Sequence, residues 1–268
     1  MNDLDEVQVV DGVVTVGAEG TEAVALRTIT LNRPRKANAL TAAMMDSLAR
    51  AIAPASDGQA AQICVLRSAS NRLFCAGADI AEFVSGADTL ARQEHALLSL
   101  IGQLAASTVP LVVVARGKAS GAGALLLALA DVVLAADDLD LACPEIEFGM
   151  FPVLVDAVLR TRVSPALAAR MCLGQSMNAT EAWQAGFLTE VLPTQEFDVL
   201  VEQRLGYYLA RAAGLGVARR SRLLHTPAAA LMAEVNRAAP LMGENFAGNG
   251  VRERISAYLA RLGRAAGR

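Results

Sequence analysis

The stretch VPLVVVARGKASGAGALLLALADVVLAA (109–136) decides the fold. Its two ends, residues 109–116 and 131–136, are mostly apolar and predict strands buried in a sheet. Between them, residues 120–131 pass from a glycine turn into a short apolar helix. A strand, a helix and a second strand in this order predict an α/β crossover and a parallel sheet.

The segments upstream extend this sheet. ICVLRS (63–68) is another continuous apolar run and predicts a third buried strand, and residues 88–105 predict the helix that follows it. VQVVDGVVTVG (7–17) and AVALRTITLN (23–32) are rich in β-branched residues and flank a turn-forming Ala-Glu-Gly at 18–20. They predict a β-hairpin at the start of the chain.

A loop and a helix connect the hairpin to the next strand. LNRPRKANAL (31–40) contains a proline and short polar residues, so we expect a loop there. Thr41 can cap the helix that follows, in which Met45, Leu48 and Ile52 mark one apolar face.

The chain changes character near residue 153, after which the pattern is almost wholly helical. Asn178 and Glu181 are spaced as a capping box, and Gly186 is expected to end the helix that they begin. Three further helical segments are predicted, at 195–213, 216–238 and 250–263.

Charge and composition exclude some functions. The 268 residues are 54% apolar and 19% charged, enough for a sizeable core, and the net charge of -3 provides no basic field for nucleic acid. Arg219, Arg220 and Arg222 form a local cluster that we interpret as a solvated helix face.

The cysteines and the apolar runs indicate a cytoplasmic protein. Cys64, Cys75, Cys143 and Cys172 lie in apolar surroundings without C-x-x-C spacing, and predict reduced, packed thiols. The acidic N-terminus lacks the pattern of a signal peptide. The longest apolar stretch, 119–136, falls short of the ~18 clean apolar residues of a membrane span.

Four short segments, in this order and spacing, carry a specific resemblance: LNRPRKANAL (31–40), FCAGADI (74–80), GKASGAGALLLALAD (117–131) and CPEIEFGMFP (143–152). Together they resemble the enoyl-CoA hydratase/isomerase family, or crotonase superfamily. ATEAWQAGFLTEVLP and VRERISAYLARLGR extend the likeness over nearly the whole chain.

The resemblance implies a fold and an assembly. We expect an α/β spiral of ββα units of the ClpP/crotonase type, with a core at 1–195 that binds a CoA thioester. A helical C-terminal region at 196–268 would serve oligomerisation, because members of the family assemble as trimers or as hexamers of paired trimers.

The resemblance also implies an oxyanion hole formed by the backbone amides of Ala78 and Ala122. A thioester oxygen gains negative charge when an α-proton leaves, and one well-aimed amide can be worth ~3 kcal/mol in stabilising it. An amide at a helix N-terminus is favoured further by the helix dipole. The family commonly has glycine where this chain has Ala122; the amide remains, but the methyl group narrows the pocket.

Glu145 matches one of the two glutamates that the family's hydratases use, whereas the other position is occupied by Leu125. Burial of a lone carboxylate among apolar residues should raise its pKa toward neutrality, which suits a base that also returns the proton. This favours double-bond isomerisation, as in the mitochondrial-type Δ3-Δ2-enoyl-CoA isomerases. Two alternatives stay open: a hydratase with a second acid from the 81–95 segment (Glu82, Asp88 or Glu94), and an acyl-CoA-binding protein that has lost catalysis.

By the same resemblance, two walls hold coenzyme A, which enters as part of the substrate. Further contacts would come from Leu125 and from the last helix. The expected contact residues are Arg35, Lys36 and Ala37 on the adenine side, Ala76, Asp79 and Ile80 opposite, and Tyr258 and Arg261 at the C-terminus.

No cofactor or metal is expected. His95 and His225 are the only histidines, and neither has a neighbouring ligand at metal-binding spacing. Ser120 lacks the G-x-S-x-G context of a nucleophilic serine.

Overall fold

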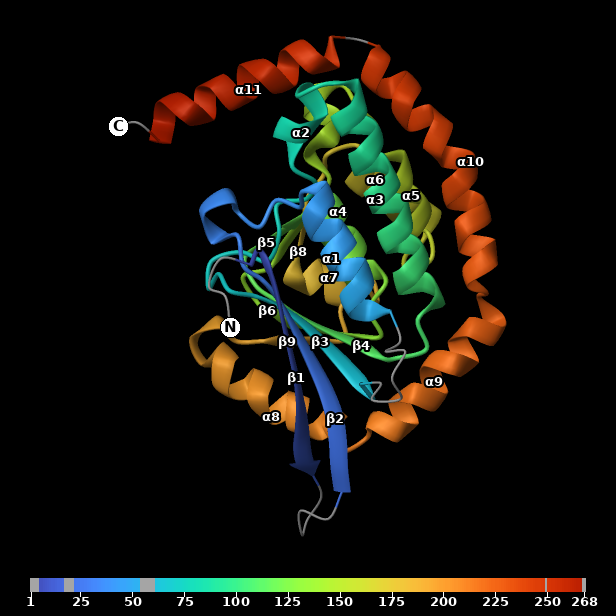
Figure 1. The fold of residues 1–268 in the computed structure, drawn as a ribbon. Helices are drawn as coiled ribbons and strands as arrows, with labels where there is room; N and C mark the ends of the chain where they lie inside the picture. Colours follow the sequence, from blue (N-terminus) through green and yellow to red (C-terminus); the bar gives the residue numbers. More distant parts are fainter. Residues whose placement is uncertain (1–4, 17–21, 54–60, 249, 267–268) are drawn as a thin grey trace.

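The computed structural model describes residues 5–16, 22–53, 61–248 and 250–266. The turn predicted at 18–20 lies outside the described residues. Figure 1 shows a twisted sheet with helices packed against it and a run of C-terminal helices that curves around the outside.

The main sheet has the strand order β1-β2-β3-β4-β6-β9 in the described part of the chain. Its strands are β1 (Val7–Val16), β2 (Glu22–Leu31), β3 (Ile63–Ser68), β4 (Leu111–Ala115), β6 (Val132–Ala136) and β9 (Glu190–Leu192). β1 pairs antiparallel with β2, which confirms the predicted hairpin, and the remaining neighbours are parallel. The parallel sheet expected from 109–136 is therefore present.

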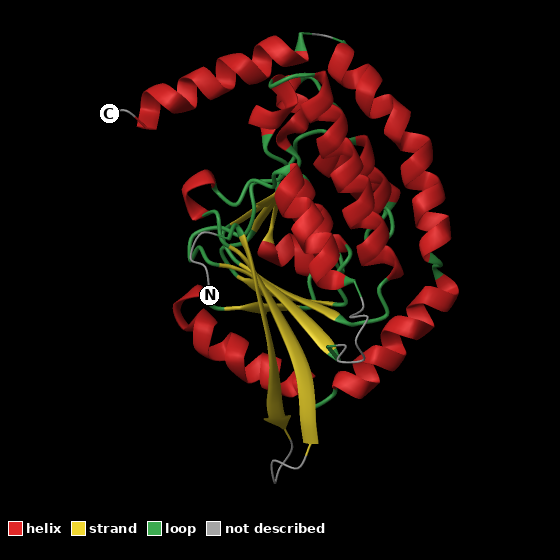
Figure 2. Ribbon diagram, in the orientation of Figure 1, coloured by secondary structure: helices red, strands yellow, loops and turns green. Residues whose placement is uncertain are grey.

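Both faces of this sheet are covered, which explains the continuous apolar runs (Figure 2). Along β4, Val113 and Ala115 face a large core cluster with the helices on one side. Val112 and Val114 face a second cluster on the other side, which includes residues of the C-terminal helix that begins at Phe197. Since successive side chains point to opposite faces, a strand covered on both sides must be apolar at every position.

The helices of the core follow the strands along the chain. They are η1 (Pro34–Lys36), α1 (Ala42–Ile52), α2 (Ile80–Val84), α3 (Ala87–Ala106), α4 (Ala122–Ala128), η2 (Pro144–Phe148), α5 (Val153–Leu159), α6 (Pro165–Cys172), α7 (Ala179–Gln184) and η3 (Thr194–Glu196). The Thr41 side chain accepts from the amide of Met44 and caps α1, and Asn178 with Glu181 forms the predicted capping box of α7.

The prediction of an almost wholly helical chain after residue 153 is wrong in part. β9 adds a sixth strand to the main sheet. A small second sheet joins β5 (Lys118–Ser120), β7 (Asp140–Ala142) and β8 (Met177–Asn178). Strands of two or three residues are too short for a period of two to be visible in the sequence.

Four helices form the C-terminal part: α8 (Phe197–Leu209), α9 (Ala212–His225), α10 (Ala228–Ala247) and α11 (Val251–Ala266). The prediction of a single helix at 216–238 is wrong, because Thr226 and Pro227 separate α9 from α10. A proline disfavours helical backbone at the residue before it. The boundary between a core and an oligomerisation region at residue 196 stays a prediction. α8, which begins just after it, packs on the main sheet.

Arg219 corrects the interpretation of the arginine cluster as a solvated face. Its side chain on α9 is 1% exposed, and its Nη1 is 2.7 Å from a carboxylate oxygen of Asp131. Its Nε also donates to the carbonyl of Ser107 at 2.7 Å, while Arg220 is exposed. This ion pair fastens the C-terminal helices to the core.

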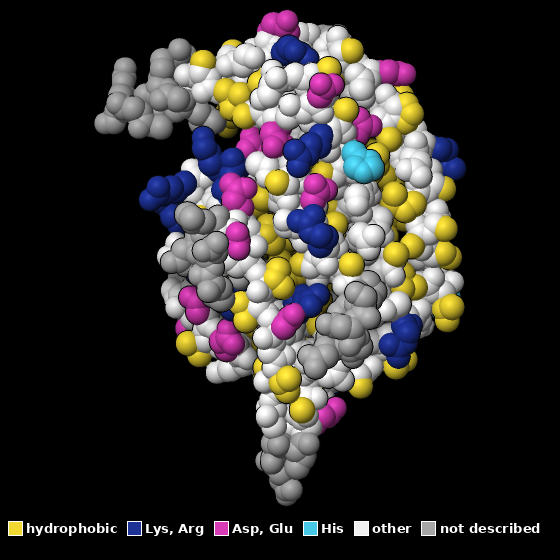
Figure 3. Space-filling model, in the orientation of Figure 1, with side chains coloured by type: hydrophobic (Ala, Val, Ile, Leu, Met, Phe, Trp, Pro, Cys, Tyr) yellow, Lys and Arg dark blue, Asp and Glu magenta, His cyan; other side chains and the backbone are white. Residues whose placement is uncertain are grey.

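The surface and the thiols agree with the composition. On the face drawn in Figure 3, basic and acidic side chains are interspersed rather than gathered into a field of one sign. All four cysteines are free and buried, as predicted. Among the described residues, no helix combines the length and apolar character needed to cross a membrane.

Candidate active site

Glu145 lies in the first turn of η2, three residues after the end of β7. Its Oε2 atom is shielded from solvent and has no hydrogen-bond partner in the described part of the chain. The residue as a whole keeps partial exposure. Burial raises the pKa of Glu145 from 4.5 to about 7, and its own backbone amide opposes this shift. The carboxyl group can therefore accept and release a proton near neutral pH.

Gly121 allows this carboxyl group to approach the start of α4. A Cβ atom placed on Gly121 would lie 2.1 Å from Oε1 of Glu145, so any side chain here would displace the carboxylate. The backbone of Gly121 has φ of 49°, and its amide donates to the carbonyl of Ala142 at 2.9 Å. The glycine turn recognised in the sequence thus brings Glu145 against the residue that precedes Ala122.

The two glycine loops of the sequence lie side by side. The amide of Ser120 donates to the carbonyl of Cys75 at 2.9 Å. A Cβ on Gly77 would lie 2.9 Å from the carbonyl oxygen of Ser120 and 3.6 Å from the amide nitrogen of Ala122. A Cβ on Gly123 would lie 2.6 Å from the carbonyl oxygen of Cys75. Only glycines permit backbones this close.

The amides of Ala78 and Ala122 keep their hydrogen-bonding capacity. Neither donates a hydrogen bond within the described residues. Ala122 is the first residue of α4, where an amide has no intrahelical acceptor and the helix dipole is positive. Two backbone donors from adjacent loops, next to one buried carboxyl group, can stabilise an anion that forms when Glu145 takes a proton.

The helix α4, against which Glu145 lies, contributes no second carboxylate. Leu125 is fully buried there and offers no proton. Glu82 is partly buried rather than solvated, and its Oε2 accepts the amide of Ala42 at 2.9 Å, which caps α1. Asp88 is exposed, and Glu94 is partly exposed with a pKa raised by burial. The described residues contain no cluster suited to a metal ion.

The residues expected to contact the adenine side of CoA form one loop. Arg35 and Lys36 are exposed at the end of η1. Ala37 caps it in the left-handed conformation, with φ of 52°. The Ala37 carbonyl accepts the amide of Ala76 at 3.0 Å, so the two predicted CoA walls are hydrogen-bonded to each other.

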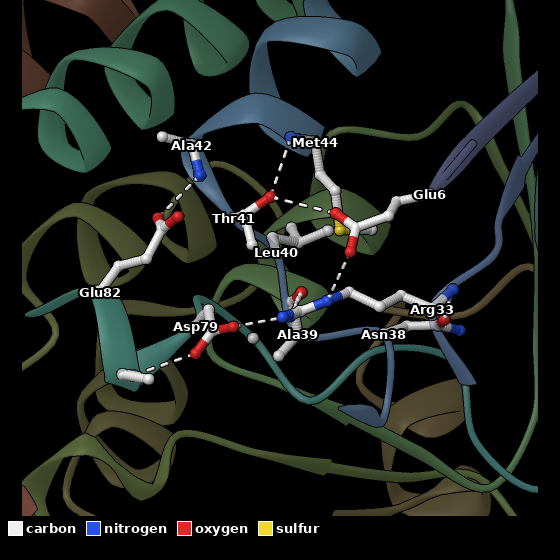
Figure 4. Close-up of polar contacts among 12 residues, drawn as sticks. Glu6, Arg33, Asn38, Ala39, Leu40, Thr41, Ala42, Met44, Asp79 and Glu82 are labelled. Atoms are coloured by element: carbon white, nitrogen blue, oxygen red, sulfur yellow. Dashed lines mark hydrogen bonds and ion pairs between the residues drawn. The ribbon is translucent and has the colours of Figure 1, made fainter. Parts of the chain in front are cut away.

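The opposite wall is less uniform. Ala76 is exposed, while Ile80 is partly buried against a cluster of apolar residues. The carboxylate of Asp79 is already engaged: Oδ2 lies 2.6 Å from Nη1 of Arg33, and Oδ1 accepts the amide of Ala81. Figure 4 shows the side chain of Arg33 between the carboxylates of Asp79 and Glu6.

The last helix packs on the η2 turn of the same chain. The Tyr258 ring meets Phe148 edge-on, with centroids 5.3 Å apart, and the Arg261 guanidinium lies 5.8 Å from the Tyr258 centroid. Arg254 donates from Nε to the carbonyl of Phe148 at 3.0 Å. A Cβ on Gly149 would lie 2.3 Å from Nη2 of Arg254.

The sequence alone assigns no individual role to Arg33, Gly121 or Arg254. Arg33 has a local signal, because it stands in the Asn-Arg-Pro sequence that follows β2. Gly121 has one as well, because it is the glycine directly before α4. Nothing local marks Arg254, because its partner lies 106 residues away.

A polar groove of about 650 Å³ lies elsewhere, between β1 and α1. Glu6, Arg27, Met44 and Arg50 are among its lining residues. Arg27 is paired with Asp11 at 2.6 Å, and none of the predicted catalytic residues lines the groove. The groove therefore lies apart from the predicted catalytic residues.

Comparisons with known proteins bear on the family and the fold. Residues 20–260 match the family model described as enoyl-CoA hydratase/isomerase. The 2,3-dehydroadipyl-CoA hydratase of Escherichia coli is 34% identical over 169 residues, which cover 62% of this chain and 65% of that protein. The chain thus spans just under two thirds of the length of this relative. A probable enoyl-CoA hydratase of Mycobacterium bovis is 33% identical over 180 residues, 66% of this chain and 68% of that protein.

The fold is shared with a solved structure. The crystal structure of an enoyl-CoA hydratase from Mycobacterium avium subsp. paratuberculosis superposes with a TM-score of 0.75 at 23% identity, over 96% of each chain. The predicted crotonase-type α/β fold is therefore confirmed.

Proposed function

This chain belongs to the enoyl-CoA hydratase/isomerase family, and from that membership and the lone carboxylate of Glu145 we propose that it isomerises the double bond of an enoyl-CoA thioester. The observation that carries the proposal is that Leu125 stands where a second catalytic carboxylate would be expected. The site has one buried carboxyl group with a pKa of about 7, and a leucine where the family's hydratases have a second glutamate.

The proposed reaction is a 1,3-shift of one proton. Ionised Glu145 takes a proton from C2 of a 3-enoyl thioester, and the electrons of the broken C–H bond move to the thioester oxygen. The amides of Ala78 and Ala122 donate to that oxygen and stabilise the dienolate. Glu145 then returns the proton to C4, so that the double bond moves to C2–C3 and the carboxylate is regenerated.

A pKa near neutrality suits both halves of this cycle. Glu145 must be ionised to act as a base and protonated to act as an acid, and general catalysis works best when the pKa lies near the working pH. Since the base is the ionised form, turnover should fall as the pH drops below about 7.

A second candidate, hydration of a 2-enoyl-CoA, is favoured by the names of the relatives, which include hydratases. Hydration needs a second proton-transfer group beside Glu145. Of the candidates, Glu82 caps α1 and Asp88 is exposed, which leaves Glu94 with its raised pKa. Among the described residues, Glu94 forms no hydrogen bond or ion pair with Glu145, Ala78 or Ala122. Isomerisation by Glu145 alone therefore fits the geometry better.

The test is to incubate the protein with 2-enoyl-CoA and 3-enoyl-CoA of short and medium chain length and to resolve the products by mass. Unchanged mass with a moved double bond supports the isomerase. Addition of one water supports the hydratase instead. Binding of thioesters without any conversion across the panel supports an acyl-CoA-binding protein that has lost catalysis.

Several features remain proposals that come from the resemblance. We propose that Arg35, Lys36 and the loops around them bind coenzyme A, that no separate cofactor is needed, and that the chain forms trimers or hexamers in the cytoplasm. The exposure of Arg35 and Lys36 at one end of η1 supports the first of these, since cations there can meet the phosphates of CoA.

A further inference from the structure

Three alternating hydrogen bonds join the loop of Ala78 to the loop that follows β2. Ala76 donates to the carbonyl of Ala37 at 3.0 Å, Leu40 to the carbonyl of Gly77 at 2.8 Å, and Asp79 to the carbonyl of Leu40 at 2.8 Å. In such a parallel bridge the bonds pass to the residues on either side of the bridged one. The amide of Ala78 is therefore left to point away from this loop, on the side where Ala122 lies.

An arginine holds the junction of these loops. Nη1 of Arg33 lies 2.6 Å from Oδ2 of Asp79 and donates to the carbonyl of Ala39 at 2.9 Å, while Nε lies 2.8 Å from Oε1 of Glu6. The exposed fractions of the Arg33 and Asp79 side chains are 18% and 13%. Figure 4 shows the guanidinium between the two carboxylates. Its planar fork suits such a position, where one cation has to meet several oxygens.

Asp79 connects the ion pair with Arg33 to the backbone at Ala78. It follows Ala78 directly, and its Oδ1 accepts the amide of Ala81 at 3.0 Å to cap α2. From the other side, the buried Gln93 donates to the carbonyls of Leu40 at 3.1 Å and Asp79 at 3.3 Å. The position of the Ala78 amide is thus held by an ion pair on one side and a side-chain amide on the other.

We propose that Arg33 and Asp79 are positioning residues whose ion pair aims the amide of Ala78 at the thioester oxygen. This inference rests on the proposed function and assigns Asp79 to the loop rather than to coenzyme A. An oxyanion donor acts only when its nitrogen lies within hydrogen-bonding distance of the developing charge, so a small displacement of the loop weakens it strongly.

The test compares Asp79→Asn with Asp11→Asn. An asparagine at position 79 keeps an oxygen that can cap α2, so that only the ion pair is lost. Asp11 forms an Arg–Asp pair of the same 2.6 Å length with Arg27 within the hairpin, away from Ala78. The substitution at position 11 therefore controls for the loss of an ion pair as such.

Two probes separate positioning from binding. Acetoacetyl-CoA reports on the oxyanion hole, because its enolate absorbs in the near ultraviolet whereas its keto form does not. Butanoyl-CoA cannot form this absorbing enolate and reports on CoA binding alone. For Asp79→Asn we expect the enolate-to-keto ratio of bound acetoacetyl-CoA and kcat each to fall about tenfold. The Kd of butanoyl-CoA should stay within twofold of the wild-type value. Asp11→Asn should match the wild type in all three.

An enolate ratio unchanged in Asp79→Asn overturns the proposal, and so does loss of butanoyl-CoA binding, which would make Asp79 a CoA contact. If the wild type binds acetoacetyl-CoA without enolising it, the oxyanion hole and this inference both fail. If the wild type enolises it but isomerises no enoyl-CoA, only the proposed function fails.

Arg33→Lys is a second variant in case Asp79→Asn is poorly folded. Lysine keeps the charge but cannot span Glu6 and Asp79 together. We expect an enolate ratio between those of the wild type and Asp79→Asn, and a wild-type ratio would contradict the proposal.

Discussion

At the scale of single residues, the chemistry depends on what lies against Glu145. Gly121 leaves room for the carboxylate, and Leu125 supplies no second acid, so in the proposed reaction Glu145 carries the proton both ways. Sequence comparison could identify Glu145 and Leu125 because each lies in a recognisable segment. It could not show that Oε2 has no partner, since that depends on side chains from several elements.

The raised pKa of Glu145 predicts a pH-dependent stability. Because the pKa in the folded protein is about 7 against an ordinary 4.5, the stabilising contribution of this group is fully present below pH 4.5 and lost as the pH rises to about 7. Above that, the buried charge costs about 3 kcal/mol. Relative to the wild type, the Tm of Glu145→Gln should rise by roughly 6 to 12 °C between pH 4.5 and 8.

Thermal unfolding at a series of pH values measures this difference. Glu147→Gln changes an exposed carboxyl group on the same turn and serves as the control. A Tm difference between Glu145→Gln and wild type that does not vary with pH would show that Glu145 is not held neutral by burial.

Restoring the missing carboxyl group should favour hydration. Leu125→Glu should raise the rate of water addition to 2-enoyl-CoA at least tenfold, because it supplies a second group for proton transfer. Leu125→Gln, of similar size but without an acidic proton, should show no gain. Equal rates for both variants, followed by mass, would mean that the shape of the pocket rather than proton transfer excludes water.

At the scale of elements, the sequence predicted what is local and missed what is not. The hairpin, the caps of α1 and α7 and the buried strands follow from periodicity and turn residues. β9 has only three residues, which is too few to show an alternating pattern in the sequence. The end of α9 before Pro227 does have a local signal, because a proline disfavours helix at the preceding residue. The approach of α11 to η2 has no local signal.

Arg254 should matter through the turn that it contacts. Its bond to the Phe148 carbonyl closes the end of η2 opposite Glu145. Arg254→Ala should therefore admit water beside Glu145, lower the pKa on the acidic limb of the kcat profile and reduce kcat about tenfold.

Arg252→Ala is the matched control on the same helix, since Arg252 lies over the ring of Phe246 instead. A pH profile of Arg254→Ala that coincides with that of Arg252→Ala would show that α11 has no influence on the site.

At the scale of the whole molecule, the C-terminal helices are part of one structure with the sheet. α8 covers one of its faces (Figure 1). The ion pair between Arg219 and Asp131 holds α9 to the core. Buried arginines are rare and are retained where they are paired, which a local cluster of arginines in the sequence does not reveal.

Arg219→Met should leave the carbonyls of Leu104 and Ser107 without this donor and remove one of the two arginines paired with Asp131. Breaking such a buried pair costs about 3 kcal/mol, which corresponds to a fall in Tm of roughly 6 to 12 °C. Arg220→Met, on the exposed neighbour, should leave Tm within about 1 °C. Equal Tm values for the two variants would contradict the role of the pair.

The central claim is that Glu145 alone moves the proton, and the measurement that tests it most directly is the conversion of 3-enoyl-CoA by wild type and Glu145→Gln. We expect the wild type to give 2-enoyl-CoA of unchanged mass, and the variant to lose 10²- to 10⁴-fold in kcat, the usual contribution of a general base. Its Kd for butanoyl-CoA should be unchanged. Full turnover by Glu145→Gln, or a wild-type product heavier by one water, would contradict the claim.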